Sequence, residues 1–395
     1  MPHMVLWGAV YASCVHSRTH TSHGERGDVV MQLPSRADHV GSLLRPVALR
    51  EARAQHAAGT LSAEALRQVE DRYIRAAIRM QEEIGLQAVT DGEYRRAFWH
   101  YDFLAGLDGV EMVEVATGIQ FSGGAQVRPV APAVTGRLGC TTDHMVDHFT
   151  FLKANTRVTP KQSIPSPTAL HYRGGRKGIS ATVYPEIEGF FHDLGLAYRK
   201  AIAAFARAGC TYLQLDEVYL AYLCDSNQYT ELRARGEDPD RLLPAYVQLI
   251  NLTIAERPAG MMLAMHLCRG NFRSSWIAQG GYEPVADLLF NTIGIDVYFM
   301  EYDTERAGGF EPLRFLPPNK MVVLGLVTSK TGVLEDKDAL KRRIDQAARY
   351  APLDQLALSP QCGFASTEEG NVLTYDEQRA KLALVVEVVH EVWGP

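Results

Sequence analysis

The chain has 395 residues, of which 46% are hydrophobic and 22% are charged, so it can supply one large or two smaller domains with a sizeable core. Its net charge of −6 comes from mixed signs without a basic stripe, which argues against nucleic acid as a partner. Six cysteines are too few for a disulfide scaffold and suit a reducing cytoplasm, and no apolar run approaches the roughly 18 residues of a membrane span.

The start of the chain differs from the rest. It carries four histidines and few helix or strand signals. A short apolar run at 5–12 has no Lys or Arg before it, whereas a secretory signal peptide begins with positive charge. We therefore expect residues 1–33 to be a disordered or mis-assigned N-terminal extension and residues 34–395 to form a single domain.

The first part of that domain alternates short apolar runs with helical patterns. A strand and turn are expected at 36–42, and an amphipathic helix at 62–83 begins with a serine, which is a good N-cap residue. A second strand with its loop follows at 88–93. Residues 109–156 then alternate segments rich in Val and Gly, which predicts a β-hairpin insertion.

The second part continues the alternation. A third strand leads into Ser163–Thr168, where two prolines predict an extended loop rather than a helix. Further strands are expected at 211–217, 261–268, 296–302, 320–327 and 355–359, and helices at 185–209, 242–256, 284–291, 336–350 and 375–393. Eight strands that alternate with helices predict an α/β fold of the (β/α)8 TIM-barrel type.

Three of the predicted strands end in residues that could bind a metal ion. His266 and Cys268 end one strand, Glu301 ends the next, and Cys362 follows the last one. Because the carboxyl ends of parallel strands meet at one edge of a barrel, these residues can converge although up to about a hundred positions separate them. One imidazole, two thiolates and a carboxylate suit a borderline-soft divalent cation, and Zn2+ is the first expectation.

Each of these residues also has a simpler interpretation. A free cysteine is more often a small buried hydrophobe, and a lone histidine at a strand end is more often a satisfied polar residue. The spacing of one residue between His266 and Cys268, however, points both side chains to the same face of a strand. Together the four residues favour metal binding, whereas the other four cysteines show no such pairing and are expected to be structural.

Six short motifs stand in order along the chain: His39-Val-Gly-Ser42, Asp91-Gly-Glu93, Gln214-Leu-Asp216, His266-Leu-Cys268, the strand end at Glu301, and Ser359-Pro-Gln-Cys-Gly363. Together they resemble the catalytic barrel of cobalamin-independent methionine synthase. The resemblance runs from about Arg36 to Trp393, and it is closest to the shorter, single-barrel members of that family. One motif alone would be weak, but six in the right order are specific.

The resemblance implies a zinc site with ligands His266, Cys268, Glu301 and Cys362, and methyl transfer to the thiol of homocysteine to form methionine. A free thiol has a pKa near about 8.5, so only a few per cent of it is thiolate at neutral pH, and zinc coordination deprotonates it. A carboxylate is the ligand most easily displaced when the substrate sulfur arrives. Glu301 therefore has an expected catalytic role as the exchangeable ligand.

By the same resemblance, Ser42, Glu93 and Asp216 are expected to hold the amino and carboxylate groups of homocysteine. Carboxylates can bind an ammonium group, and a hydroxyl or a backbone turn can bind a carboxylate. The simpler interpretation of Glu93 and Asp216 is a structural pair at the mouth of the barrel. Three aromatic residues could stack on a flat methyl donor such as a pterin: Phe98, Trp99 and Tyr172.

Two features depart from the family pattern and leave the methyl donor open between methyl-folate and another compound. The chain lacks the additional N-terminal barrel of the full-length enzymes. Thr328-Ser-Lys330 stands where the family carries an Asp-x-His that resembles a proton donor. Lys330 is therefore the expected catalytic acid, provided that burial lowers its pKa, although lysine does not replace histidine equivalently.

Two alternatives to methionine formation stay open. In the first, the zinc thiolate is kept but another thiol is alkylated, as in enzymes that join an epoxide to a sulfonated thiol. Arg95, Arg96 and Lys330 motivate this reading, because they could hold a sulfonate or protonate an alkoxide. In the second, the protein is a metal-free barrel of the uroporphyrinogen decarboxylase type or a binding module. In the leading reading the partners are a small-molecule thiol and a methyl donor, with a homodimer as a possible assembly.

Overall fold

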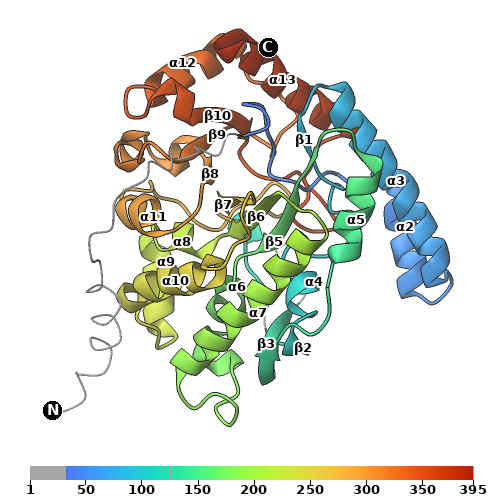
Figure 1. Cartoon of the computed structure of the whole chain (residues 1–395), viewed down its shortest axis with the longest axis vertical. Coiled ribbons are helices and arrows are strands. Elements are labelled where there is room, and N and C mark those ends of the chain that lie inside the picture. Colours follow the sequence, from blue (N-terminus) through green and yellow to red (C-terminus); the bar gives the residue numbers. More distant parts are fainter. Residues whose placement is uncertain (1–32, 117, 125–126, 128, 395) are drawn as a thin grey trace, which may run out of the picture. The chain divides into compact units, whose positions relative to one another are not determined.

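The computed structural model describes residues 33–116, 118–124, 127 and 129–394. The expected N-terminal extension, 1–33, lies outside the described residues apart from its last residue. The described residues form a mixed α/β fold in which helices alternate with strands, as the sequence predicts (Figure 1). No helix in this described part is both long and apolar enough to cross a membrane.

The bounds of the elements follow the expected pattern to within a few residues at most ends. The strands are β1 Ala88–Val89, β2 Asp108–Glu114, β3 Val130–Gly139, β4 Thr159–Pro160, β5 Gln162–Pro165, β6 Tyr212–Glu217, β7 Met262–Leu267, β8 Val297–Glu301, β9 Met321–Val327 and β10 Leu356–Pro360. The helices are α2 Val47–Ala57, α3 Ala63–Glu83, α4 Tyr101–Leu104, α5 Val146–Asn155, α6 Thr168–Tyr172, α7 Ile187–Arg207, α8 Tyr219–Tyr222, α9 Ser226–Ala234, α10 Pro239–Ile254, α11 Ala286–Thr292, α12 Lys337–Ala347 and α13 Tyr375–Trp393.

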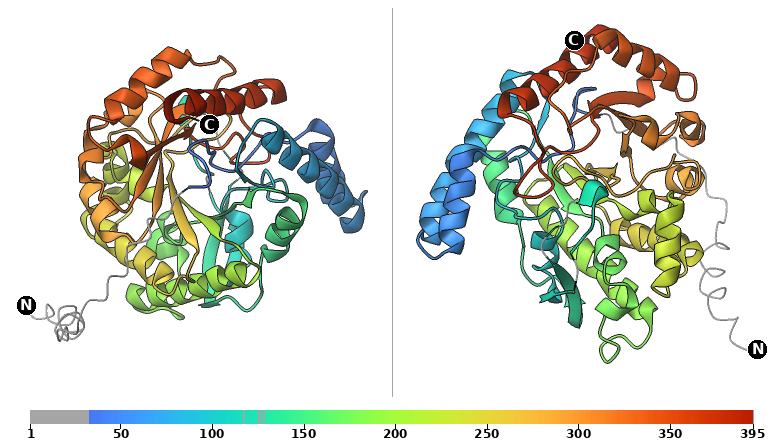
Figure 2. Two further views of the ribbon diagram at one scale, coloured as in Figure 1. Left: turned by 45° about the horizontal axis from the view of Figure 1, so that its top comes forward. Right: turned by 180° about the vertical axis from the view of Figure 1, so that it is seen from behind.

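The central sheet contains six parallel strands in the order β10-β9-β8-β7-β6-β5. Beyond β10, Ala37 forms a parallel bridge with Leu358. At the other end, β1 pairs in parallel with β4, which leads directly into β5. Figure 2 shows the strands at the centre with helices around them. Because the paired strands are parallel, their carboxyl ends lie at one edge.

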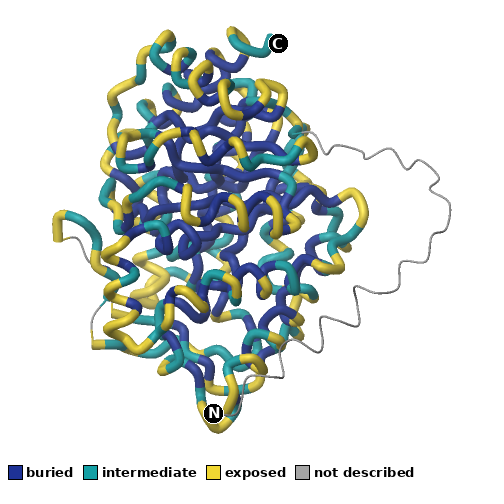
Figure 3. The backbone as a smooth tube through the Cα atoms, turned by 90° about the vertical axis from the view of Figure 1, so that its left-hand side faces the viewer, coloured by how far each residue is buried: buried dark blue, intermediate teal, exposed yellow. Residues whose placement is uncertain are grey.

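The central strands are buried along their whole length, which explains why they are continuous apolar runs rather than alternating ones. Alternate residues of neighbouring strands form one compact apolar cluster, which includes Ala264, Phe299 and Val323. The residues between them belong to the larger cluster that packs against the helices. Figure 3 shows the buried backbone gathered in the middle of the fold. Both faces of the sheet are therefore packed.

Two helices show how local sequence sets the element bounds. Ser62 caps α3, and its hydroxyl accepts a hydrogen bond from the amide of Ala65 at 3.1 Å, which confirms the predicted helix start. At the end of the chain, Thr374 and Glu377 form a reciprocal capping box that begins α13. This last helix packs on β10 and holds the strand that precedes Cys362.

The prediction of an extended loop at Ser163–Thr168 is wrong in part. Residues as far as Pro165 belong to β5, and α6 begins at Thr168. The strand ends at Pro165, which has no amide hydrogen to donate, and the next amide, that of Ser166, donates to the carbonyl of Asp216 at 2.9 Å. Pro165 therefore ends the strand, and its presence in the sequence is compatible with a strand before it.

The range 109–156, where a β-hairpin insertion is expected, contains most of β2 together with β3 and α5. The strands β2 and β3 pair antiparallel, from Glu114 opposite Val130 to Asp108 opposite Gly139. The helix α5 packs against α3 and α7. The segment therefore combines a hairpin with a helix, and the alternating Val and Gly residues indicate only the hairpin.

Candidate active site

The four predicted metal ligands come together in the structure. His266 lies in β7, Cys268 directly follows that strand, Glu301 ends β8, and Cys362 follows β10. One ligand atom from each of the four residues lies within 4.8 Å of the others, and all four side chains are buried. The parallel strands thus place residues that are distant in sequence at one edge of the sheet, as the positions of these residues at strand ends predict.

The donor set fits a zinc ion. The sulfur atoms of Cys268 and Cys362 are 3.6 Å apart. Ligands at about 2.0–2.3 Å from a tetrahedral zinc are roughly 3.3–3.8 Å from one another. Both ring nitrogens of His266 are buried without a hydrogen-bond partner, which is unusual for a structural histidine. An imidazole nitrogen, two thiol sulfurs and a carboxylate oxygen are also the atoms that zinc accepts.

The two thiols of the cluster ionise at different pH. Their mutual hydrogen bond lowers the pKa of Cys362 well below its usual value, with a further contribution from His266, and burial opposes both. The same hydrogen bond, together with burial, raises the pKa of Cys268 well above its usual value. Burial disfavours a charged His266, but the Cys362 thiolate raises the pKa of this ring above the ordinary value. The cluster therefore favours a thiolate at Cys362.

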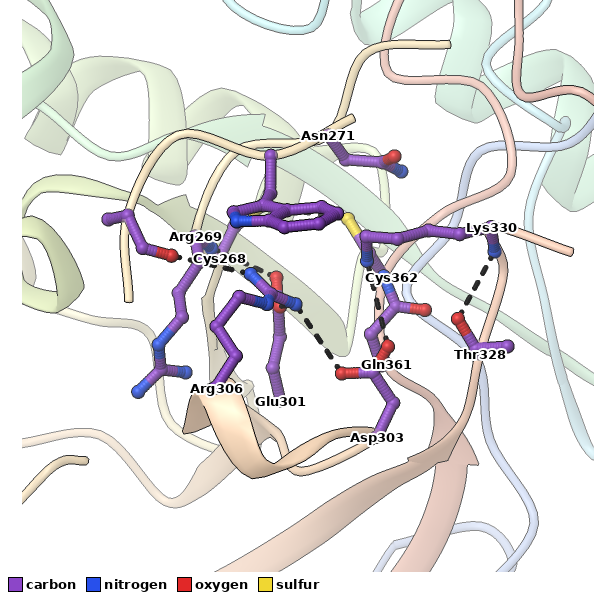
Figure 4. A network of polar contacts seen from close by, with 12 residues as sticks. Cys268, Arg269, Asn271, Glu301, Asp303, Arg306, Thr328, Lys330, Gln361 and Cys362 are labelled. Atoms are coloured by element: carbon purple, nitrogen blue, oxygen red, sulfur yellow. Dashed lines mark hydrogen bonds and ion pairs between the residues drawn. The ribbon is translucent and has the colours of Figure 1, made fainter. Parts of the chain in front are cut away.

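Glu301 is held from two sides. Its Oε1 accepts a hydrogen bond from the amide of Arg269 at 2.9 Å, and its Oε2 accepts one from Arg306 at 3.1 Å (Figure 4). Burial alone would raise the pKa of Glu301, but Lys330 and Arg306 lower it below its usual value. The carboxylate is therefore ionised and oriented before it meets any ligand.

Lys330 belongs to the polar network around Glu301 and does not line the cavity described below. Its Nζ lies 3.7 Å from Oδ2 of Asp303, whose other oxygen accepts a hydrogen bond from Arg306 at 3.5 Å (Figure 4). The side chain is nearly buried. The structure thus places Lys330 close to Glu301 and behind the wall of the cavity.

A cavity lies beside the cluster. All the predicted metal ligands except Glu301 line it, and so do the three predicted substrate residues Ser42, Glu93 and Asp216. Other lining side chains are those of Arg96, Phe98, Trp99, Phe121, Arg173 and Tyr222. The site therefore joins a soft-metal donor set to a pocket that has charged groups and aromatic surface.

Glu93 takes its place through an unusual backbone. Its φ angle of 59° lies in the left-handed region, and its amide donates to Oδ1 of Asp91 at 2.8 Å. Its carboxylate forms an ion pair with Arg96. Gly41, with φ of 141°, passes so close to this carboxylate that a Cβ there would collide with it. The glycine of the Val-Gly-Ser motif is therefore required because its backbone passes close to Glu93.

Asp216 and Ser42 approach the cavity from different elements. Gln214 donates to Oδ1 of Asp216 at 2.7 Å within β6. Burial raises the pKa of this carboxyl group, and His266 acts in the opposite direction. The hydroxyl of Ser42 accepts a long hydrogen bond from the amide of Ala365 at 3.3 Å, in the turn that follows Cys362. The predicted substrate residues thus lie next to the predicted metal ligands.

Other predicted residues have different positions. Arg95 pairs with two acidic residues of α3 and is not part of the cavity wall. Tyr172 stacks on Tyr219, with ring centroids 4.3 Å apart, and it does not line the cavity either. Phe98 and Trp99 do line it. Of the three aromatic residues suggested for stacking on a donor, the structure therefore places two at the cavity.

Sequence reasoning missed Arg173 and Tyr222, which also line the cavity. Arg173 follows α6, which has five residues, and Tyr222 ends α8, which has four. Elements this short have no periodicity from which the exposed or cavity-facing positions could be read. No motif quoted from the sequence includes either residue.

Comparisons with known proteins agree with this geometry. The model of a family described as "Cobalamin-independent synthase, Catalytic domain" matches residues 36–391. YxjH of Bacillus subtilis (strain 168), an uncharacterized protein, is 47% identical over 372 residues, which are 94% of this chain and 98% of YxjH. The crystal structure of a candidate vitamin-B12-independent methionine synthase from Listeria monocytogenes has a TM-score of 0.74 at 41% identity. The similarity covers 92% of this chain and 99% of that one.

A more distant relative has a named activity. The 5-methyltetrahydropteroyltriglutamate–homocysteine methyltransferase of Bacillus velezensis is 25% identical over 293 residues, which are 74% of this chain and 35% of that enzyme. The family match spans the strands and turns that carry all four donors of the cluster. The chain therefore belongs to the cobalamin-independent synthase family, whose members are methyltransferases of the methionine synthase type, and residues 36–391 are its catalytic domain.

Proposed function

We propose that the protein is a zinc-dependent S-methyltransferase that transfers a methyl group to the thiol of homocysteine and forms methionine. The observation that carries this proposal is the buried cluster of one histidine, two cysteines and one glutamate at the wall of a cavity. The same cavity contains Ser42, Glu93 and Asp216, which suit an amino-acid substrate. The names of the relatives are consistent with this chemistry.

We further propose that the sheet closes as a (β/α)8 TIM barrel and that residues 34–395 form one catalytic domain with an insertion at 109–156. The bridge from Ala37 to β10 and the pairing of β1 with β4 support closure, because they continue the sheet at both of its ends. The amide of Leu43 also donates to the carbonyl of Gly92 at 3.1 Å, which links the first segment to the loop after β1.

The chain's own residues would hold the zinc through His266, Cys268, Glu301 and Cys362. When it is bound, zinc supplies a Lewis acid that keeps a substrate thiol deprotonated at neutral pH. Two cysteinates and a glutamate outweigh the charge of a divalent cation, so a substrate thiolate keeps its electron density and its nucleophilicity. Arg306 and the amide of Arg269 hold the carboxylate of Glu301, and they would keep it oriented whether or not it coordinated the zinc.

The substrate residues have complementary charges for an amino acid. Glu93 and Asp216 would accept hydrogen bonds from the ammonium group, and the ion pair with Arg96 keeps the local charge from becoming strongly negative. Ser42, next to the turn that follows Cys362, would donate to the carboxylate. The methyl donor would be methyl-folate or another methyl compound. Since thiol chemistry needs reduced cysteines, we place the protein in the cytoplasm.

Alkylation of a sulfonated thiol has less support from the geometry. The three cations that motivate it, Arg95, Arg96 and Lys330, each lie beside a carboxylate, so none of them is free for a sulfonate. A metal-free barrel also has less support, because it leaves both nitrogens of His266 buried and unpaired. Methyl transfer to an amino-acid thiol remains the reading that uses the most features of the cavity.

The first test is the metal content of Cys362→Ala, with Cys210→Ala as the matched control. Cys210 is also buried, but burial raises its pKa to about 12 and it lies outside the cluster. We expect about one zinc per chain in the wild type and in the control. In Cys362→Ala we expect little zinc and a loss of homocysteine methylation of more than about 100-fold, because loss of even an outer partner of a metal site costs 10–100-fold.

Mass spectrometry of the metal, circular dichroism and a methionine assay would measure these outcomes. Full zinc occupancy and full activity in a folded Cys362→Ala protein would refute the proposal. Zinc X-ray absorption then tests the substrate: homocysteine should add one sulfur neighbour as an oxygen leaves. The same change with 2-mercaptoethanesulfonate and not with homocysteine would favour the sulfonated-thiol reading.

A further inference from the structure

The cavity is lined by two guanidinium groups that differ in their partners. Arg96 forms an ion pair with Glu93. Arg173 has no acidic partner within the described ranges of the chain, and its Nε is enclosed without a hydrogen bond. The residue as a whole is half-buried. A partly buried charge without a counter-charge is incompletely solvated, so such a group in a cavity wall indicates an anion that comes with a ligand.

The immediate neighbours of Arg173 are tyrosines rather than carboxylates. Its guanidinium carbon lies 5.6 Å from the ring centroid of Tyr219 and 6.0 Å from that of Tyr222. Burial raises the pKa of both phenols above the ordinary value, so both are neutral at pH 7. Burial disfavours the charged guanidinium, but the pKa of Arg173 stays above its ordinary value, so the group is positive at pH 7. The rings stabilise the cation without neutralising it.

Tyr222 places a hydrogen-bond donor at the wall of the same cavity. Its side chain is 1% exposed, and its hydroxyl has no hydrogen-bond partner among the described atoms. A Cβ built on Gly270 would lie 2.9 Å from this hydroxyl, so the oxygen sits against the loop that follows Cys268. A buried hydroxyl without a partner is costly unless a ligand accepts its proton in a hydrogen bond.

We propose that Arg173 and Tyr222 form an anion-binding subsite of the cavity, which holds a carboxylate of the methyl donor. This inference rests on the proposed function, because it assigns the anion to the second substrate of a methyl transfer. In the proposed function, the carboxylate of the thiol substrate would bind Ser42 and the neighbouring turn, on the same cavity wall. The uncompensated cation is therefore left for the donor.

The remaining wall of the cavity suits the body of such a donor. Phe98, Trp99 and Phe121 line the same cavity as Arg173 and supply apolar surface. A planar carboxylate can take two hydrogen bonds from a guanidinium and a third from a phenol hydroxyl. The subsite thus selects an acidic donor that has an apolar part, and it discriminates against donors that lack the acid.

The test compares two probes, one with carboxylates and one without the portion that carries them. 5-Methyltetrahydrofolate carries carboxylates, whereas a 5-methyltetrahydropterin without the benzoylglutamate portion carries none. Isothermal titration of the zinc-loaded protein without homocysteine measures both, so that no methyl transfer occurs during the titration. We expect Arg173→Met to raise the dissociation constant of the folate about 10- to 100-fold and to leave that of the pterin unchanged, and Tyr222→Phe to act in the same direction but less strongly.

Arg235→Met is the matched control. Arg235 is exposed and lies over the ring of Tyr172 at 5.2 Å, and it donates to the backbone carbonyl of Arg173 at 3.3 Å. The control therefore removes an equal charge from the same neighbourhood but outside the cavity wall. We expect it to leave the binding of both probes unchanged. Arg173→Lys keeps the charge without the planar group and should be intermediate for the folate.

Three outcomes would overturn the subsite: a wild type that binds the folate no better than the pterin, equal losses for both probes in Arg173→Met, or a loss for homocysteine alone. In the last case, unaltered binding of 3-aminopropanethiol, which lacks the carboxylate, would assign the anion to the thiol substrate. Zinc content and the sulfur shell of the zinc report thiol activation separately. If Arg173 and Tyr222 do not bind the donor, the proposed function can still be tested through the zinc. If the protein does not activate a thiol, the binding of the folate can still be measured.

Discussion

Lys330 influences the candidate site through the charge on Glu301. It is one of the cations that lower the pKa of that carboxyl group, and it lies in the network of Asp303 and Arg306 rather than at the cavity wall. We therefore expect Lys330→Met to weaken zinc binding or turnover about tenfold, as the loss of an outer partner of a metal site does. Lys330→Arg keeps the charge and should keep most of the activity.

Competition with a zinc chelator and steady-state kinetics would measure both variants, and Lys341→Met on the exposed face of α12 is the control. If Lys330 instead donates a proton to the departing group, Lys330→Arg should lose as much turnover as Lys330→Met while both keep their zinc. That pattern would return Lys330 to the role of catalytic acid, which the sequence predicts.

The residues of the site differ in how well the sequence predicts them. The sequence predicts the four candidate metal ligands because they are reactive residues at the ends of apolar strands, and such ends converge when the strands are parallel. They are His266, Cys268, Glu301 and Cys362. Arg173 could not be found, because the property that singles it out is the lack of an acidic partner. That property belongs to the packed structure and leaves no pattern in the chain.

At the scale of elements, a buried ion pair joins the segment before α2 to the strand pair β4 and β5. Lys161 Nζ lies 3.1 Å from Oδ1 of Asp38, and both side chains are at most 1% exposed. Tyr212 donates to the other oxygen of Asp38 at 2.6 Å. Since removing one partner leaves a buried charge unpaired, we expect Lys161→Met to lower the free energy of unfolding by about 3–5 kcal/mol.

Urea unfolding of the metal-free protein would measure this loss. Adding Asp38→Asn to Lys161→Met should recover part of it, because the double variant no longer buries an unpaired carboxylate. Lys341→Met removes two partly exposed ion pairs, with Asp338 of α12 and with Glu391 of α13, and should cost far less than Lys161→Met. Equal losses in the two single variants would contradict a role for the buried pair in joining these elements.

The elements were predictable to different degrees for physical reasons. Strands such as β9 are buried on both faces, so they are short, continuous apolar runs with polar ends. β5 was harder, because its last residue is Pro165, and a proline signals a loop unless its place at the end of the strand is known. The first segment forms only one bridge, at Ala37, so its pattern predicted more strand than the structure has.

For the whole molecule, two buried histidines should make stability depend on pH. Burial lowers the pKa of His39 to about 4, with Lys161 acting in the same direction, and burial lowers the pKa of His171 to about 4 as well. An unfolded histidine has a pKa near about 6.5, so between pH 6.5 and 4 the unfolded chain binds more protons than the folded one. Stability is therefore full above pH 6.5 and falls as the pH drops toward 4.

We expect each histidine to account for about 2 kcal/mol of the loss of unfolding free energy between pH 7 and pH 5. His171→Gln can keep a hydrogen bond to Tyr246, whose hydroxyl lies 2.8 Å from Nδ1 of the histidine, but it cannot titrate. Its unfolding free energy, measured in urea at both pH values, should therefore change by about 2 kcal/mol less than that of the wild type. The acid sensitivity of the four predicted metal ligands is common to both proteins and cancels in this difference. An unchanged pH dependence would therefore show that His171 does not stay neutral in the folded protein.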